Sequence, residues 1–237
     1  MNRNMIDGRQ DHLAQVALYG RYVFERGLAS STGGNISCRA GESVLISTHG
    51  SCLGDLDEAS TVSVSLGGEL LQSRRPSSEL PVHLEIYRQF PGVGGIVHGH
   101  SPYAVAASTL LELSDDDALP AYSAGYLIRV GSLPLIPFIE SGSPALAHRV
   151  AEAIGRSGHA VLIRNHGFFA VGGDLAEAFY TADELQDALR VYMFSSGQAV
   201  ALPPEVCDRI RAAHRDGPVR TRPQNDENQR DAEMSRP

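Results

Sequence analysis

Residues 95–100 read Gly-Ile-Val-His-Gly-His, a short apolar run that ends in two histidines separated by one glycine. Apolar residues bounded by turn residues predict a short strand over Gly95–His98. Side chains two positions apart in a strand point to the same face, so His98 and His100 are expected to converge. Gly99 keeps the position between them small. The stretch therefore predicts a sheet with a pair of imidazoles at the end of one strand.

A third histidine, His166, lies in the run Arg164-Asn-His-Gly167, a turn between strands expected over Ala160–Ile163 and Phe168–Val171. Three neutral imidazoles that leave one coordination position open are typical of a catalytic metal site. Nitrogen ligands favour Zn²⁺, with Mn²⁺ or Co²⁺ as alternatives. Taken singly, each histidine could equally be a hydrogen-bonded core or surface residue. That role is what we expect for the histidines without such neighbours: His12, His83, His148, His159 and His214.

Helical and extended patterns alternate along the rest of the chain. Helices are expected over His12–Gly27, Ser78–Phe90, Pro102–Leu111, Pro144–Ile154 and Asp174–Phe194. Further strands are expected over Ile36–Cys38, Val44–Ser47, Val62–Leu66, Glu69–Gln72 and Leu133–Ile139, the last at an edge because it contains prolines. This order indicates one α/β domain with a mixed or antiparallel sheet. We expect residues 1–10 to be a flexible end, 11–216 the catalytic domain, and 217–237 a disordered tail.

Composition limits the partners and the compartment. The formal charge is −8, and no run of Lys or Arg resembles a nucleic-acid footprint. No apolar stretch approaches the roughly 20 residues needed to span a bilayer, and the polar start has no signal peptide. The three cysteines, Cys38, Cys52 and Cys207, form no disulfide pattern. We therefore expect a cytoplasmic protein that binds neither membrane nor nucleic acid.

Two polar segments suit chemistry beside a metal. Glu79 follows Ser77 and Ser78 at the predicted start of a helix, where a carboxylate could serve as acid and base. Gly34 and Asn35 lie in a glycine-rich loop that could bind an anion together with the two serines. The alternative for each segment is ordinary helix capping and turn formation.

Five motifs occur in an order and spacing that resemble the class II aldolase/adducin family: Gly33-Gly-Asn35, Leu45-Ile-Ser-Thr-His-Gly50, Ser77-Ser-Glu79, His98-Gly-His100 and Asn165-His-Gly167. The resemblance runs from about Asp11 to Ser196. It implies a single-domain α/β/α sandwich around a mostly antiparallel sheet. It also implies a homotetramer with active sites at subunit interfaces, acting on a small anionic substrate.

The resemblance also implies roles for individual residues. His98, His100 and His166 would hold one divalent metal per subunit, and Glu79 would be the acid/base and an occasional fourth ligand. Members of this family bind the anionic end of the substrate at positions that match Gly34, Asn35, Ser77 and Ser78 here. A family tyrosine that protonates the substrate would correspond to Tyr126, with Tyr122 as the alternative.

His49-Gly50 departs from the family pattern, because the sugar-phosphate aldolases have threonine before the glycine of this anion pocket. An imidazole there could pair with phosphate, a carboxylate or a phenolic oxygen. We therefore expect a divalent-metal-dependent carbon–carbon lyase that works through a metal-stabilised enolate and decarboxylates a hydroxylated aromatic or sugar acid. The alternatives are a class II aldolase that cleaves a sugar phosphate such as fuculose 1-phosphate, an epimerase or dehydratase, and a non-catalytic adducin-like scaffold.

Overall fold

A seven-stranded sheet forms the centre of the fold. The computed structural model describes residues 3–214, with side chains described from residue 10 onward. The strands lie in the order β3-β2-β1-β4-β7-β6-β5, and every neighbouring pair is antiparallel except β5 and β6. Their bounds are β1 Asn35–Ala40, β2 Ser43–Ser47, β3 Thr61–Ser65, β4 Gly95–Gly99, β5 Leu135–Ile136, β6 Ala160–Ile163 and β7 Gly167–Gly172.

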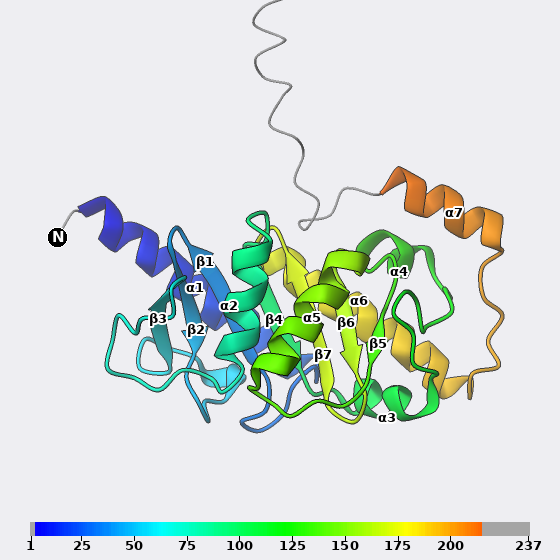
Figure 1. Cartoon of the computed structure of the whole chain (residues 1–237), viewed down its shortest axis with the longest axis horizontal. Helices are drawn as coiled ribbons and strands as arrows, with labels where there is room; N and C mark the ends of the chain where they lie inside the picture. Colours follow the sequence, from blue (N-terminus) through cyan, green and yellow to red (C-terminus); the bar gives the residue numbers. More distant parts are fainter. Residues whose placement is uncertain (1–2, 215–237) are drawn as a thin grey trace, which may run out of the picture.

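Helices cover both faces of this sheet, which confirms the expected α/β/α sandwich (Figure 1). The helices α2 Leu80–Gln89 and α5 Pro144–Ser157 share an apolar core with one face. The other face packs against α1 Arg3–Glu25, α3 Pro102–Leu110, α4 Ala124–Arg129, α6 Leu175–Phe194 and α7 Pro204–Ala213. A short 3-10 helix, η1 Leu53–Asp55, contacts α1. The buried strand β4 therefore has a helical layer on each side.

Local capping explains where several of these helices begin. The Asp174 carboxylate accepts a hydrogen bond from Glu177 N (2.8 Å), and Glu177 Oε2 accepts one from Gly173 N (2.9 Å). These two contacts satisfy backbone donors at the start of α6 that have no partner inside the helix. Ser143 likewise accepts from Leu146 N at the start of α5, as its sequence position predicts.

Several predicted boundaries differ from the structure. The first helix begins at Arg3 rather than at His12. The segment Glu69–Gln72 turns back along β3 as expected, but it makes a single bridge, between Leu70 and Val64, rather than a full strand. The helices α4 and α7 were not predicted from the sequence. The helix α4 has only 6 residues, and α7 begins at two consecutive prolines. The predicted tail 217–237 lies outside the described residues.

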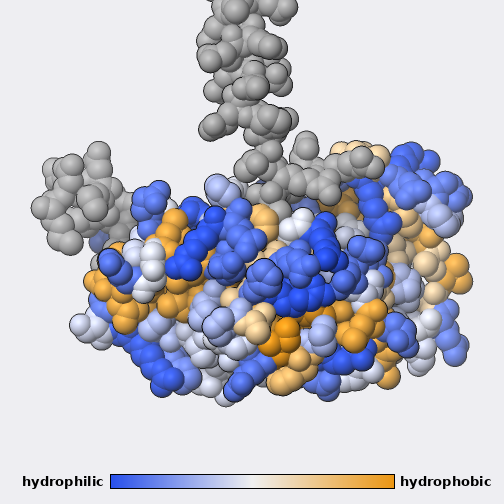
Figure 2. Space-filling model, in the orientation of Figure 1, coloured by the Kyte–Doolittle hydropathy of each residue, from blue (hydrophilic) through white to orange (hydrophobic). Residues whose placement is uncertain are grey.

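The outer surface is mixed in character. Hydrophilic side chains cover much of the molecule on the side of α2 and α5, with separate apolar groups between them (Figure 2). Among residues 3–214, no helix combines the length and the apolar content required to cross a bilayer.

Candidate metal centre

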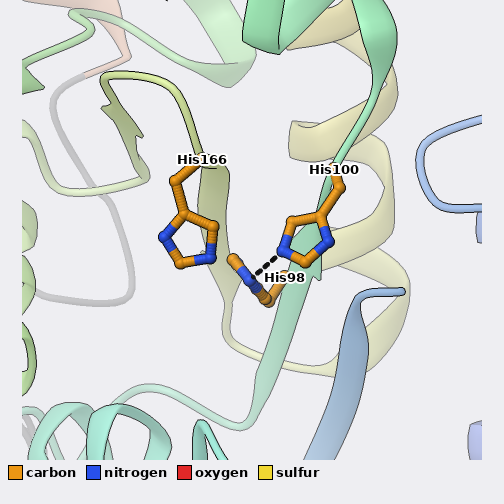
Figure 3. Close-up of side chains that lie close together, drawn as sticks. All are labelled: His98, His100 and His166. Atoms are coloured by element: carbon orange, nitrogen blue, oxygen red, sulfur yellow. Dashed lines mark hydrogen bonds between the residues drawn. The ribbon is translucent and has the colours of Figure 1, made fainter. Parts of the chain in front are cut away.

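The pairing of β4 with β7 brings the three predicted histidines together. His98 lies in β4 opposite Phe169 of β7, and His100 lies one residue past the end of β4. His166 precedes β7, in the tight turn from β6, where Asn165 adopts a left-handed conformation (φ 57°). One potential ligand atom from each histidine lies within 4.8 Å of the others (Figure 3).

Hydrogen bonding fixes how His98 faces this cluster. Its side chain is fully buried, and its ring stacks on Phe169 at 4.0 Å between centroids. Its Nδ1 donates to the Phe168 carbonyl oxygen (2.9 Å), which leaves the lone pair of a neutral ring on Nε2. That atom lies 2.7 Å from His100 Nε2 (Figure 3). A backbone carbonyl that orients a ligating histidine in this way is common at metal sites.

Glycines permit the close approach of the two strands at the cluster. A Cβ on Gly167 would lie 2.2 Å from the Gly99 carbonyl oxygen, and a Cβ on Gly99 would lie 2.5 Å from the Phe168 ring. A Cβ on Gly33 would lie 3.1 Å from His100 Nδ1. The residues beside the histidines are therefore glycine because any larger side chain would separate the segments that hold the imidazoles.

Burial keeps the imidazoles uncharged. It lowers the pKa of His98 well below its usual range, and the neighbouring His100 and His166 lower it further. Burial, together with His166, lowers the pKa of His100 to about 4. The pKa of His166 is also lowered by burial, although Glu79 opposes this shift. Neutral imidazoles are the form that binds metal, so the cluster is ready to ligate at neutral pH.

The donor set therefore fits a divalent metal. Three imidazoles converge, which suits Zn²⁺ or a similar ion with an open position. Nδ1 of His166 is buried and has no hydrogen-bond partner within the described part of the chain. His166 is thus oriented by packing and by the turn rather than by a second hydrogen bond.

Glu79 lies beside the cluster at the N-terminus of α2. Its side chain is almost fully buried (2% exposed), and its Oε1 lies 3.7 Å from His166 Nε2. The Ser141 hydroxyl donates to Oε1, and Gly142 N donates to Oε2 (3.4 Å). Sequence reasoning missed Ser141 and Gly142, and only the Gly-Ser-Pro turn before α5 could have marked that loop. The carboxylate is held in place from the loop before α5 and faces the histidines.

The predicted anion-binding residues surround the same end of the sheet. Asn35 pairs with His98 across β1 and β4, so both side chains share one face. Gly34 has a positive φ (75°) and packs so closely that a Cβ would lie 2.7 Å from the His98 carbonyl oxygen. The loop before β1 therefore lies directly against the histidines.

The segment before α2 lies beside the end of β2. His49 N donates to the Arg75 carbonyl oxygen (3.0 Å), and Ser77 N donates to that of Ser47 (3.1 Å). Ser77 is buried and accepts from Glu79 N, whereas Ser78 is exposed. His49 and Gly50 are exposed, and Gly50 has a positive φ (75°) with open space around it. These residues form a polar surface next to Glu79.

Tyr126 lies elsewhere. It is fully buried in the core on the α6 side of the sheet, and its hydroxyl donates to Asp117 Oδ1 (3.0 Å). Asp117 also pairs with Arg211 of α7 (2.6 Å). Burial raises the pKa of Tyr126 well above its usual range. Its hydroxyl therefore has a partner within this core, and half-buried Tyr122 packs against the same core.

His83 has a larger part in the site than the sequence indicated. It is fully buried in α2, Nε2 contacts Asn35 Oδ1 (2.5 Å), and Nδ1 contacts Ser37 Oγ (2.7 Å). Burial lowers its pKa to about 3. Its position four residues after Glu79, on the same side of a helix, was the available signal.

A sequence profile described as "Class II Aldolase and Adducin N-terminal domain" matches residues 14–193. The chain belongs to this family. A 3-oxo-tetronate 4-phosphate decarboxylase of Pectobacterium atrosepticum is 34% identical over 187 residues, which cover 78% of this chain and 85% of the relative. An L-fuculose phosphate aldolase of Methanococcus maripaludis is 33% identical over 165 residues, which cover 70% and 87%.

Solved structures of this family share the fold. YgbL of Escherichia coli, described as an aldolase, epimerase or decarboxylase, superposes with a TM-score of 0.80 at 28% identity and covers 85% of this chain and 98% of its own. An L-fuculose 1-phosphate aldolase gives a TM-score of 0.77 at 26% identity and covers 87% and 97%. The chain is thus an enzyme of the class II aldolase family, a carbon–carbon lyase as expected.

We predict that His83→Gln will reduce the loss of the free energy of unfolding as the pH falls. The unfolded chain binds a proton at His83 near its usual pKa of about 6.5, whereas the folded protein does so only near 3. The wild type should therefore lose stability as the pH falls from about 6.5, by up to about 1.4 kcal/mol per pH unit from this residue.

Urea unfolding at pH 7, 6, 5 and 4 measures this difference, and His148→Gln on the exposed surface of α5 is the matched control. The control should follow the wild type. Equal slopes for His83→Gln and the wild type would show that His83 titrates normally in the folded protein.

Proposed function

We propose that the enzyme decarboxylates a phosphorylated 3-oxo sugar acid. The observation that carries this proposal is the juxtaposition of the three-histidine cluster and buried Glu79 with a polar surface that suits an anion. The relatives named 3-oxo-tetronate 4-phosphate decarboxylase, from five strains of four bacterial species and 30–34% identical to this chain, support this substrate class.

Phosphate is preferred here over a hydroxyaromatic acid. His49 is exposed, so its imidazole is accessible to an anion. Its backbone lies beside that of Arg75, an exposed cation next to Ser77 and Ser78. Hydroxyls, backbone N–H groups and cationic side chains are the groups that bind phosphate oxygens.

His98, His100 and His166 would hold the metal, with Glu79 available as a further ligand. When bound, a divalent ion supplies a Lewis acid that stabilises the negative charge left as the carbon–carbon bond breaks. Zn²⁺ is the first candidate, with Mn²⁺ or Co²⁺ as alternatives.

Glu79 would transfer the proton. Departure of CO₂ from a 3-oxo acid leaves the bonding electron pair on the adjacent carbon as an enolate, and a proton must then reach that carbon. Glu79 is buried beside the cluster, and Ser141 and Gly142 N hold both carboxylate oxygens in a fixed orientation. A positioned carboxyl group of this kind can act as a general acid and base. The resemblance implies a tyrosine as a second proton donor, Tyr126 or the alternative Tyr122.

Aldol cleavage is the second candidate reaction. It also leaves an enolate, and the relatives named L-fuculose phosphate aldolase favour it. The named relatives are enzymes, which disfavours the non-catalytic scaffold. Epimerisation or dehydration would use the same residues. We also expect a cytoplasmic homotetramer, as the resemblance implies.

We predict CO₂ release from 3-oxo-tetronate 4-phosphate by the metal-loaded enzyme, with no aldehyde release from fuculose 1-phosphate. Coupled assays for CO₂ and for aldehyde measure the two reactions in parallel, and unphosphorylated 3-oxo-tetronate tests the need for phosphate. Chelation should abolish turnover because the largest electrostatic stabilisation would be lost. Aldehyde release without CO₂ would establish the aldolase alternative, and full turnover after chelation would rule out both reactions as described.

Replacing Glu79 by Gln should lower kcat by about 10²–10⁴-fold, because proton transfer by a positioned group contributes about that much. KM should change far less. Steady-state kinetics at constant metal occupancy measure both values. Glu85→Gln, on the same helix, is the matched control and should keep the wild-type kcat. A Glu79→Gln enzyme with wild-type kcat would remove Glu79 from the proposed chemistry.

A further inference from the structure

A chain of buried hydrogen bonds runs from the metal-centre side of β1 into α2. His83 Nε2 contacts Asn35 Oδ1 (2.5 Å), and His83 Nδ1 contacts Ser37 Oγ (2.7 Å). The single proton of the Tyr87 hydroxyl is shared between Ser37 Oγ (2.9 Å) and the Ser37 carbonyl oxygen (3.0 Å). All four side chains are at most 4% exposed. Such a chain is too well buried to exchange partners with water.

The orientation of the Asn35 amide, with Oδ1 toward His83, sets the protons in this chain. An amide oxygen only accepts, so His83 Nε2 must carry the proton that it donates to Asn35. A neutral imidazole has one N–H, so Nδ1 is unprotonated and accepts from the Ser37 hydroxyl. His83 therefore presents a donor to Asn35 and an acceptor to Ser37.

This arrangement determines which end of the Asn35 amide is left for a ligand. The amide oxygen is occupied by His83, whereas no hydrogen bond from the amide nitrogen is described within residues 3–214. Turning the amide over would place its –NH₂ group against the Nε2 proton, donor against donor, unless that proton moved to Nδ1 and the Ser37 hydroxyl reversed its hydrogen bond. It would also present an oxygen, which repels an anion. Asn35 pairs with His98 in the sheet, so the free –NH₂ group belongs to the metal-centre end.

We propose that His83 is a positioning residue: it holds the Asn35 amide so that its –NH₂ group donates to the phosphate of the substrate. This inference rests on the proposed function for the phosphate. His83 does not touch the substrate. It acts by favouring the amide orientation that binds phosphate, and the Ser37 hydroxyl, by donating to Nδ1, stabilises the tautomer that carries the proton on Nε2.

Calorimetric titration of the metal-loaded protein with inorganic phosphate tests the proposal, using the variants His83→Leu, His83→Gln, Asn35→Ala and His83→Leu/Asn35→Ala. His83→Leu removes the donor and should raise the phosphate Kd roughly tenfold, the effect of one lost hydrogen bond. Asn35→Ala should raise it at least as much. The double variant should match Asn35→Ala alone, because His83 has no route to phosphate except through Asn35.

His83→Gln keeps an N–H donor near the position of Nε2 and should restore binding to near the wild-type Kd. This rescue separates positioning from folding, since a merely structural role would not depend on the donor. Thermal unfolding of each variant confirms that it is folded. The proposal would be overturned if His83→Leu bound phosphate as tightly as the wild type, or if the effects of the two substitutions multiplied in the double variant. It would also be overturned if His83→Gln bound phosphate as weakly as His83→Leu, or if the wild type did not bind phosphate.

The titration involves no carbon–carbon bond cleavage, so its outcome is independent of the CO₂ assay. The predicted phosphate pattern without CO₂ release would leave His83 in its role and reject only the decarboxylation. In the kinetic assay, His83→Leu should raise KM for the phosphorylated substrate with little change in kcat, the reverse of the pattern expected for Glu79→Gln.

Discussion

The antiparallel pairing of β4 with β7 is the interaction on which the site depends. It places His98 opposite Phe169, and it brings the turn that carries His166 against the chain just past β4. The two strands approach closely because Gly99 and Gly167 leave no side chains between them. Imidazoles from distant parts of the sequence thus share one small volume. A shift of this register by one residue would turn His98 to the opposite face of the sheet.

The helix α2 adds the second constraint, because its N-terminal turns supply two polar groups to the same end of the sheet. Glu79 caps the helix and faces His166, and His83 follows one turn later and contacts Asn35. One rigid element therefore couples the proposed proton carrier to the proposed anion-binding residue. Sites supported by helices and strands in this way hold their geometry better than sites made of loops alone.

The sequence predicted the parts of the fold with strong local signals. Ser143 and Asp174 marked helix starts, and the apolar run before His98 marked a buried strand. The glycine pair Gly67-Gly68 predicted the turn after β3, but not that the returning segment would make only one bridge, because a turn signal does not set the length of the pairing.

The candidate site could likewise be predicted only in part from local sequence patterns. The spacing of His98 and His100 predicted their convergence, but the position of His166 beside them depends on strand order, for which the resemblance was needed. The contacts of His83 with Asn35 and of Ser141 with Glu79 join residues that are far apart in the chain. No local pattern reports such contacts, because they arise only when the sheet and α2 pack together.

X-ray absorption spectroscopy of the zinc-loaded protein tests the central claim most directly, because it reports the atoms bound to the metal. Three imidazole nitrogens at about 2.0–2.1 Å, with the remaining scatterer an oxygen, is the result expected for His98, His100 and His166 around one ion. Loss of one imidazole in the His166→Ala variant would assign the third ligand. A spectrum with sulfur ligands, or one unchanged in that variant, would contradict the account.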